Sequence, residues 1–377
     1  MPNIAEAVEG LPLGPLRAPL GAAGAYLVGG WVRELAAGRD PGGDVDIAVE
    51  GELEPLLDGL DPAVEVEVHG RHARFGAASV AIDGLRIDLT QTRRETYAHP
   101  GALPEVEPAP IGEDLRRRDF TVNAIAVPLA RPDELLDPFG GVDDLRTGTL
   151  RVLHDGSFAD DPTRAIRAAR YAARLGLEPE PETRRLLAAT DLETISGDRR
   201  DAELARLAAE DAAPRGFALL SEWGVLAVSP SALDLIEAVG ELAAREPWAG
   251  DPSIRSRAIL MAADGGKRAE AALRLAVAEP ERPSEAVRIA AGHADAELLL
   301  AVAAGAAWID EYLQSWREVS LEIGGEDLLA AGVPEGPDVG AALRGTLERK
   351  LDGGLSGGRD AELELALALA RRSAESI

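Results

Sequence analysis

The apolar pattern of the chain changes near residue 159, and this change constrains the fold more than any other feature. Before it, short strand-like segments alternate with turn-like segments, whereas after it Ala- and Leu-rich helical periodicity prevails. A spacing of two residues indicates strands, and a spacing of three to four indicates helices. The 377 residues suffice for two or three domains. We therefore predict an α/β region followed by an all-helical remainder.

Charge and composition exclude several classes of protein. The net charge is −27, and nearly all positive charge is arginine, because Lys267 and Lys350 are the only lysines. A general nucleic-acid binder carries a basic excess, so any RNA site here is a local arginine patch whose binding depends strongly on salt. Without cysteine there are no disulfides and no thiolate metal sites. No long apolar run or leader is evident, which predicts a cytoplasmic protein without a membrane partner.

Three segments in the first region carry clear local signals. Residues 44–49 (DVDIAV) alternate polar and apolar side chains, which predicts a strand with one polar face. Segments 79–82 and 85–89 flank Asp83-Gly84, a two-residue hairpin signal. Residues 98–113 are rich in Pro, Gly and Glu, which predicts a long mobile loop.

Asp44 and Asp46 are the first candidates for chemistry. On a strand, residues i and i+2 point to one face about 7 Å apart. Two carboxylates on one face can hold a hard cation through oxygen ligands. Asp88 completes a carboxylate cluster if its strand lies beside residues 44–49. The alternative for all three residues is a solvated strand face.

Gly29 and Gly30 precede a short helical segment that contains Arg33. Glycines before a helix let backbone N–H groups approach a phosphate, and an arginine in the first turn can clamp its oxygens. An ordinary tight turn is the alternative. The order of a glycine turn, a short helix and then the D-x-D strand favours a site that brings a triphosphate and a metal together.

The run from Arg116 to Arg118 is the densest basic segment, and Asp119 follows it. Asp119 is suited to orient a neighbouring arginine, and Asn123 to cap a helix or bind a sugar. The alternative is a charged loop before a strand.

A helix is predicted from residue 160 to residue 175, opening with Asp160, Asp161 and Pro162. Four arginines recur in it at spacings of 3, 3 and 4 and so share one face: Arg164, Arg167, Arg170 and Arg174. Asp161 lies one turn before Arg164, on the same side. An Asp–Arg pair offers the acceptors and donors needed to read a base edge, and the other arginines suit phosphates. A helix face laced with salt bridges is the alternative.

Together these segments resemble the class II tRNA nucleotidyltransferase and poly(A) polymerase family of the polymerase-β superfamily. The matching stretches are YLVGGWVRELAAG (26–38), DVDIAV (44–49), RRETYAHPGALPEV (93–106), EDLRRRDFTVNAIA (113–126), LLDPFGGVDDLRTGTLRVL (135–153), DDPTRAIRAARYAARLG (160–176) and, more loosely, GGEDLLAAGVPEGPDVG (324–340). The chain departs from the family pattern at Glu34, at the glycine-rich loop 40–43 and at Asp160, and none of these departures removes a required carboxylate or arginine.

The resemblance implies roles for single residues. Asp44 and Asp46 match the catalytic carboxylates that bind Mg²⁺, the expected cofactor. Asp161 and Arg164 match the amino-acid pair that selects C or A without a nucleic-acid template. The full set of expected nucleotide-binding residues is Gly29, Gly30, Arg33, Arg118, Asp119, Asn123, Asp161, Arg164, Arg167 and Arg170.

The resemblance also implies a fold and an activity. We expect an α/β, polymerase-β-like nucleotidyltransferase head with a small mixed sheet (1–148), then an all-α neck (149–215), body (216–318) and tail (319–377). The expected activity is addition of C and A from CTP and ATP to the 3′ end of tRNA, releasing pyrophosphate. Alternatives are A-only addition, CC-only addition, poly(A) polymerisation and a non-catalytic RNA-binding protein. The intact acids speak against the last, and the segment 93–106 favours CCA or A addition. The oligomeric state is left open.

Overall fold

The computed structural model describes residues 4–58, 67–72 and 76–374. The chain divides into two compact units, residues 1–227 and residues 228–377, and each is described by itself. Among the described helices, none is both long and apolar enough to cross a membrane.

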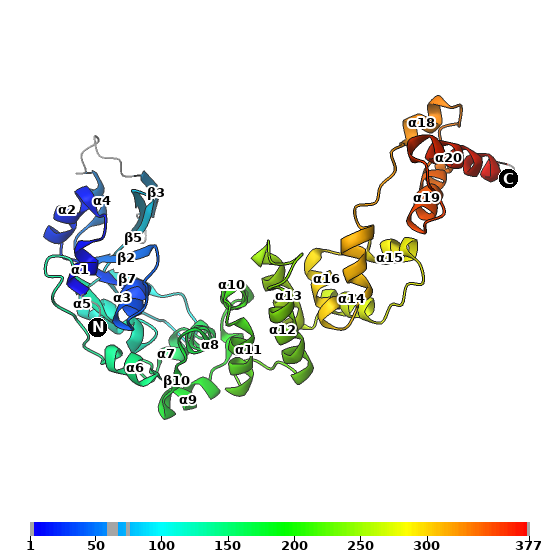
Figure 1. Ribbon diagram of the computed structural model, residues 1–377. Helices are drawn as coiled ribbons and strands as arrows, with labels where there is room; N and C mark the ends of the chain where they lie inside the picture. The colour runs from blue at the N-terminus through cyan, green and yellow to red at the C-terminus, as the bar shows by residue number, and fades with distance from the viewer. Residues whose placement is uncertain (1–3, 59–66, 73–75, 375–377) are drawn as a thin grey trace. The chain divides into compact units, whose positions relative to one another are not determined.

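The first unit is built around a six-stranded mixed sheet in the order β3-β4-β5-β2-β1-β8. Figure 1 labels three of its strands, β3, β5 and β2. Its strands are β1 Ala25–Val28, β2 Asp44–Val49, β3 Glu67–His72, β4 Ala77–Ile82, β5 Leu85–Gln91 and β8 Ala126–Pro128. Only β2 and β5 run parallel, and the other neighbours are antiparallel. The predicted α/β head with a small mixed sheet is confirmed.

The predicted hairpin is also confirmed, since β4 pairs with β5 through Asp83 and Gly84. Both residues adopt positive φ angles, 49° and 79°, as the favoured two-residue hairpin turn requires. The strand registers then place functional candidates side by side. Asp46 lies opposite Val28 on β1 and opposite Asp88 on β5.

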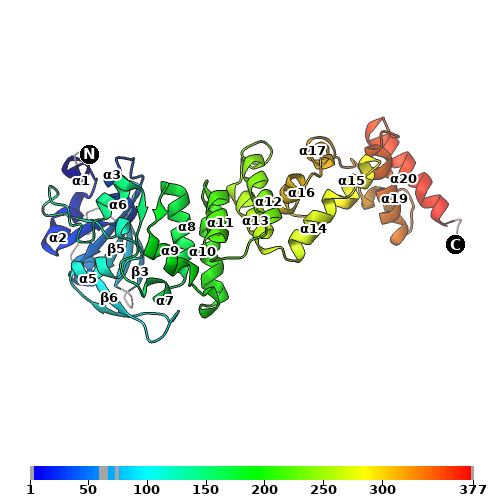
Figure 2. The ribbon, with the colours of Figure 1, turned by 90° about the horizontal axis from the view of Figure 1, so that it is seen from below.

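Helices cover the sheet and then continue beyond it. In residues 4–227 they are α1 Ile4–Glu9, α2 Arg17–Ala22, α3 Gly29–Ala36, α4 Leu53–Asp58, α5 Ile111–Arg116, α6 Gly141–Thr147, α7 Ser157–Asp160, α8 Thr163–Leu175, α9 Pro181–Ala188, α10 Gly197–Ala209 and α11 Ala213–Glu222. Two short ladders accompany them, β6 Arg93–Thr96 with β7 Glu105–Pro108, and β9 Thr149–Leu150 with β10 Glu178–Pro179. Helix α8 packs against α10 and α11, which lie beside it in Figure 2. Small buried side chains on α8, such as Ala168 and Ala169, permit this close approach.

The prediction of a long mobile loop at 98–113 is wrong in part. Residues 105–108 form β7, residues 111–116 form α5, and only the connection between β6 and β7 is irregular. The strand escaped prediction because charged residues dominate it. Arg94 donates to Glu107 across the ladder at 2.9 and 2.6 Å, but both side chains are exposed, so the backbone pairing with β6 rather than this ion pair defines the strand.

The arginine-bearing helix begins later than predicted. Asp160 ends α7, Asp161 is extended with φ −138° and ψ 94°, and α8 starts at Thr163. Pro162 explains the difference, because a proline disfavours helical backbone at the preceding residue. Asp161 therefore lies just outside the helix rather than one turn before Arg164 within it.

The second unit is helical. Its helices are α12 Pro230–Leu242, α13 Pro252–Asp264, α14 Lys267–Ala276, α15 Pro283–Ala290, α16 Asp295–Ala303, α17 Trp308–Glu311, α18 Gly325–Ala330, α19 Pro337–Leu351 and α20 Gly358–Ala374, with a π-helical turn at Tyr312–Trp316. Several open with proline at the first position, where its missing N–H costs nothing. Helices α18 to α20 have a small core of their own that includes Ile323, Leu328 and Ala366.

Candidate active site

The pair of acids lies at the exposed face of β2. Asp44 and Asp46 are exposed, whereas Val45 and Ile47 are buried in the core below the sheet. Within the described residues, no hydrogen bond or ion pair engages either carboxylate. Their oxygens are therefore available to a ligand.

The surroundings of Asp46 favour a bound cation. Although the Asp46 residue is open to solvent, the protein around its carboxylate displaces part of the water and raises its pKa; Arg118 opposes this effect, and the Asp88 and Asp44 carboxylates add to it. Asp88 stands beside Asp46 in the sheet and accepts from Ser79 Oγ at 2.5 Å. No group of three or more acidic or histidine side chains that could hold a metal occurs in the described part of the chain. Two carboxylates with substrate phosphates and water are a usual set for Mg²⁺.

Gly29 brings the start of α3 against Asp46. Its φ is +71°, and a Cβ built at this position would lie 2.7 Å from Asp46 Oδ2. Only glycine allows both the backbone conformation and this close approach. Gly29 and Gly30 form the first turn of α3, so free backbone N–H groups lie next to the acids.

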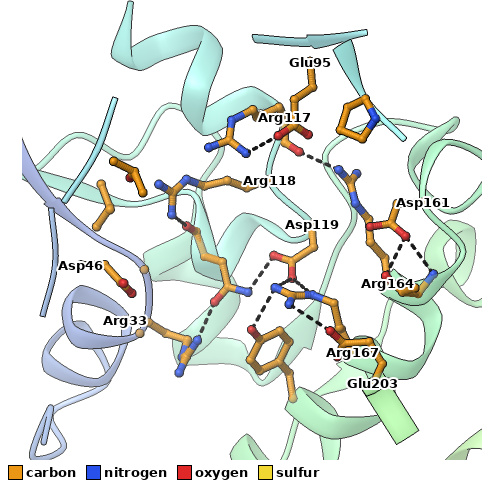
Figure 3. A pocket seen from close by; sticks show the side chains of 18 of the residues that line it. Arg33, Asp46, Glu95, Arg117, Arg118, Asp119, Asp161, Arg164, Arg167 and Glu203 are labelled. Atoms are coloured by element: carbon orange, nitrogen blue, oxygen red, sulfur yellow. Dashed lines mark hydrogen bonds and ion pairs between the residues drawn. The ribbon is translucent and has the colours of Figure 1, made fainter. Parts of the chain in front are cut away.

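Arg33 begins a buried chain of hydrogen bonds that Figure 3 displays. It is 3% exposed and donates from Nη1 to Asn123 Oδ1 at 2.6 Å. Asn123 Nδ2 donates to Asp119 Oδ1 at 2.8 Å, and Arg167 donates to Asp119 Oδ2 at 2.9 and 2.6 Å. Burial raises the pKa of Asp119, but Arg167 and Asn123 outweigh it and the pKa is lowered overall. Asp119 thus orients Arg167, not the neighbouring Arg118.

A second buried carboxylate, Asp114, holds the arginine run in place. It is 1% exposed and accepts from Arg117 at 2.7 Å and from Arg118 at 3.0 Å. Arg118 Nε is buried without a hydrogen-bond partner in the described structure, and Arg118 also lines the cleft. The Arg118 guanidinium is therefore held in place where it lines the cleft.

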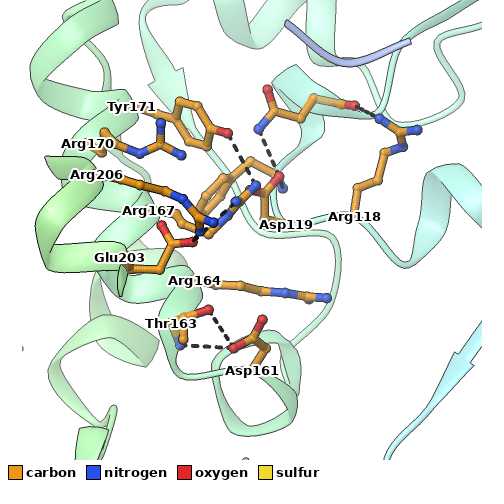
Figure 4. A network of polar contacts seen from close by, with 12 residues as sticks. Arg118, Asp119, Asp161, Thr163, Arg164, Arg167, Arg170, Tyr171, Glu203 and Arg206 are labelled. Carbon is orange, nitrogen blue, oxygen red and sulfur yellow. Dashed lines mark hydrogen bonds and ion pairs between the residues drawn. The ribbon is translucent and has the colours of Figure 1, made fainter. Parts of the chain in front are cut away.

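The proposed selecting pair lies at the start of α8, as Figure 4 shows. The bonds to Asp161 all end on Oδ1, from the Thr163 backbone at 3.1 Å, the Thr163 hydroxyl at 2.6 Å and Arg199 at 3.0 Å. Arg164 is 5% exposed and donates to Ser157 Oγ at 2.8 Å and to the Arg117 carbonyl at 2.7 Å. Both side chains are held rigidly before any ligand arrives.

The other arginines of α8 are also engaged. Arg170 and Arg174 each approach Glu210 at 3.2 Å. Tyr171 lies among four guanidinium groups, including that of Arg33, at 4.9 to 5.6 Å from its ring centre. Cation–π attraction of this kind stabilises a cluster of like charges.

Two cavities meet at these residues. The first cavity, of about 480 Å³, contains both Asp46 and the Asp161–Arg164 pair. The second cavity, of about 700 Å³, contains Asp44, Arg39, Arg170 and Arg174. They share four lining residues: Gly30, Arg33, Asp46 and Tyr171.

The first cavity also has lining residues that the sequence did not single out. They are Glu95 and Tyr97 from the β6–β7 segment, Tyr171 from α8, and Arg199 and Glu203 from α10. Arg199 and Glu203 are four apart, which places them on one helix face. That spacing is the only local signal, and it is common in surface helices.

This fold defines a nucleotidyltransferase head with a mixed sheet, followed by a mostly helical remainder. Residues 25–151 match the model of the poly(A) polymerase head domain. The chain is 36% identical to the CC-adding tRNA nucleotidyltransferase of Deinococcus radiodurans over 332 residues, 84% of this chain and 82% of that protein. The chain belongs to the family of class II tRNA nucleotidyltransferases and poly(A) polymerases.

Other relatives match more narrowly or by structure. The A-adding tRNA nucleotidyltransferase of Aquifex aeolicus is 45% identical over 165 residues, which are 43% of this chain and 20% of that protein. The chain thus spans only one fifth of that relative. The solved structure of the Thermotoga maritima CCA-adding enzyme complexed with tRNA matches with a TM-score of 0.72 and 26% identity, covering 97% of this chain and 98% of that one.

Proposed function

We propose that this protein adds C and A, from CTP and ATP, to the 3′ end of tRNA and releases pyrophosphate. One observation carries the proposal: the first cavity is lined both by Asp46 of β2 and by Asp161 and Arg164 at the start of α8. A single nucleotide can therefore meet the acids with its phosphates and the Asp–Arg pair with its base. The tRNA complex of the Thermotoga enzyme supports the choice of acceptor.

The two cavities suggest how a nucleotide is held. Asp46 is common to both, so the reacting α-phosphate belongs there. The first cavity mixes acceptors and donors, which suits a nucleoside. The second cavity gathers Arg33, Arg39, Arg170 and Arg174 beside the N-terminus of α3, which suits the β- and γ-phosphates.

The carboxylates fit a bound Mg²⁺. Asp44 and Asp46 offer oxygen ligands, lie on one strand face and have no protein partner in the described structure. When bound, Mg²⁺ lowers the pKa of the attacking hydroxyl and neutralises charge on the triphosphate. Asp88 extends the negative cluster through its place beside Asp46.

Residues of the protein itself would position the nucleotide for the reaction. The RNA 3′-hydroxyl loses its proton to solvent as its oxygen attacks the α-phosphorus, a new P–O bond forms, and the bond from the α-phosphorus to the bridging oxygen breaks, releasing pyrophosphate. Gly30 and Arg33 would hold the phosphates, Arg118 would meet the nucleotide where it lines the first cavity, and Asp161 with Arg164 would read the base edge. Positioning and charge stabilisation supply most of the acceleration in such transfers.

The alternatives within the family differ in which nucleotides are added. The two relatives reported above by sequence are an A-adding and a CC-adding enzyme, so identity alone does not choose among partial and complete addition. The β6–β7 segment is present and contributes Glu95, Tyr97 and Pro104 to the cleft. This favours an enzyme that also adds A. The unpaired Asp44 and Asp46 disfavour a non-catalytic RNA-binding protein.

We also propose that different parts of the chain bind the nucleotide and the RNA. The head (1–148) and neck (149–215) bind the nucleotide, whereas the body (216–318) and tail (319–377) contact the RNA. Because the proposed substrates are tRNA and ribonucleoside triphosphates, we propose that the protein acts in the cytoplasm.

The decisive experiment supplies three tRNA transcripts that end before CCA, after C and after CC. Each is incubated with Mg²⁺ and with CTP or ATP separately, and the products are sized. CCA addition predicts two C additions to the first transcript and one A addition to the third. A protein that adds C to the first two transcripts but no A to the third, or that adds only A to the third, is a partial enzyme. No extension of any transcript would refute nucleotide addition.

A further inference from the structure

The proposed tail (319–377) has a core of its own, and an acidic side chain joins it to the proposed body. Helices α18, α19 and α20 pack around Leu328, Ala342 and Ala366. Helix α15 of the body contacts α19, and Figures 1 and 2 show these two helices next to each other. Asp352, the residue that directly follows α19, makes the polar bonds of this contact that are described next.

Asp352 caps the first turn of α15 from the tail. Its Oδ1 accepts from the Ser284 backbone N–H at 2.9 Å, and its Oδ2 accepts from the Ser284 hydroxyl at 2.9 Å. Arg282 Nη1 lies 3.6 Å from the same Oδ2. Arg282 stands at the N-cap position of α15, and its side chain makes no capping bond. Because the first N–H groups of a helix need an acceptor, α15 takes from the tail the acceptor that its own N-cap residue does not supply.

The environment of these bonds makes them sensitive to a single substitution. Ser284 is buried, and the Asp352 side chain is only 20% exposed. Hydrogen bonds to a carboxylate are stronger than those between neutral groups, and a negative charge at the start of a helix interacts favourably with its dipole. Without the Asp352 carboxylate, both donors of Ser284 lose their acceptor while they remain shielded from water.

Lys350, two residues earlier, holds the connecting chain to the tail. Its Nζ donates to the Ser320 carbonyl at 2.8 Å and to Glu362 Oε1 at 2.6 Å. Glu362 is 1% exposed, and its Oε2 accepts from the Glu322 backbone at 2.6 Å. The connection is therefore fixed to the helices of the tail, whereas Asp352 fixes the tail to a helix of the body.

This contact is separate from the nucleotide site. All the residues that line the two cavities fall between residues 28 and 203. Under the proposed function, body and tail contact the RNA, so the tail influences the reaction through RNA that lies outside the cleft. Two surfaces that are held together bind one partner more tightly than two that move independently, because less freedom is lost on binding.

We propose that Asp352 is a positioning residue that holds the tail against α15 and thereby sets the affinity for full-length tRNA. This inference rests on the proposed function. We expect an RNA hairpin that carries only the acceptor stem to bind without the tail, so its use does not depend on Asp352.

The test measures kcat and KM for tRNA lacking CCA and for the hairpin, with the full-length protein, Mg²⁺ and saturating CTP. Asp352→Ala should raise KM for the tRNA about fivefold or more. Its kcat, and both constants for the hairpin, should stay within about twofold of the wild type. Asp352→Asn should restore most of the affinity, because its amide oxygen still accepts from the Ser284 backbone.

The matched control is Asp360→Ala, which removes the same charge from an exposed position of α20. A less negative tail repels RNA less, so this variant should leave KM for the tRNA unchanged or lower it. The charge effect and the positioning effect of Asp352→Ala therefore have opposite signs. A fall in KM for the tRNA in Asp352→Ala would overturn the proposal.

A second measurement reports on the contact without RNA. The chain has no cysteine, so Val277→Cys and Ala368→Cys place one spin label on the exposed surface of α14 and one on that of α20. Pulsed electron-spin distance measurements should give a narrow distribution in this protein and a broader one after Asp352→Ala is added.

The outcomes separate this inference from the proposed function. Failure of the wild type to extend any tRNA would refute the proposed function, and the spin-label distances would still test whether Asp352 holds the tail. An unchanged KM for the tRNA, or an equal rise in KM for tRNA and hairpin, would overturn the proposal. A distance distribution that Asp352→Ala does not broaden would overturn it as well.

Discussion

The two ends of the first cavity are built in different ways. At the proposed metal end, Asp46 lines the cavity, Asp44 of the same strand face lines the second cavity, and the described structure shows no hydrogen bond or ion pair to either carboxylate. At the proposed selecting end, Asp161 and Arg164 are both held by other residues before a nucleotide binds. Under the proposed function, the open carboxylates suit a cation, and the held Asp–Arg pair suits discrimination between bases, which requires fixed donors and acceptors. Mutations at the two ends should therefore change two different properties: the rate of nucleotide addition and the preference between CTP and ATP.

The largest effect is expected at the metal end. Asp44→Ala or Asp46→Ala should lower nucleotide addition about a thousandfold or more, because the cation loses a ligand. Folding should be intact, since neither side chain packs in the core. Rates of tRNA extension and thermal melts measure the two properties. Asp40→Ala, in the exposed loop before β2, is the control. Turnover near that of the wild type in either variant contradicts the assignment.

Asp119→Asn should instead affect stability. Its carboxylate is buried with Arg167, and breaking such a pair costs about 3 kcal/mol or more. Because the pKa of Asp119 is lowered in the fold, its contribution is present above its ordinary value of 3.8 and is lost as the pH falls through the folded pKa. Urea unfolding of both proteins should therefore show a full difference at pH 7 and a smaller one near pH 3. A constant difference across this range would argue against the charge as its cause.

Asp161→Ala should alter the preference between CTP and ATP more than the affinity for the triphosphate. Removing its carboxylate takes away an acceptor for the base edge, so the preference between CTP and ATP at a given tRNA end should weaken about tenfold. Triphosphate affinity should change little, because Arg33 and the start of α3 remain. Competition assays with both nucleotides measure the preference. Unchanged selectivity would separate Asp161 from base reading.

Arg199→Gln should give the smallest change. Arg199 touches Asp161 at 3.0 Å and the Gly101 carbonyl at 2.8 Å, so it positions the selecting acid and anchors the β6–β7 connection. We expect the CTP–ATP preference to fall about threefold, the size of one modest hydrogen bond. Arg200→Gln, its more exposed neighbour, is the control. A loss equal to that of Asp161→Ala would show that Arg199 itself meets the nucleotide.

The sequence predicted features that depend on neighbouring residues. The shared face of Asp44 and Asp46, the Asp83–Gly84 hairpin and the α/β order followed from local patterns. The start of α8 differs from the prediction because Pro162 disfavours helical backbone at Asp161. The strand β7 was missed because its stability comes from pairing with β6, which composition does not reveal.

Contacts between segments that are distant along the chain could not be predicted from local sequence patterns. Asp114 looks like an ordinary helix-start acid, yet it is buried under Arg117 and Arg118. Glu203 looks like a surface residue of an amphipathic helix, and its exposure is decided by α8, about forty residues earlier in the chain. Neither the residue spacing nor the charge pattern of α10 predicts its contact with α8.

The cations that line the cleft are all arginines, and this has a practical consequence for labelling. The chain has two lysines, and both Lys267 on α14 and Lys350 on α19 belong to residues 228–377. Reagents that acylate amines will therefore modify lysine side chains in the second unit alone and leave the arginines that line the cavities unmodified. A dye or a surface tether can be attached in this way while the cleft keeps its native charge.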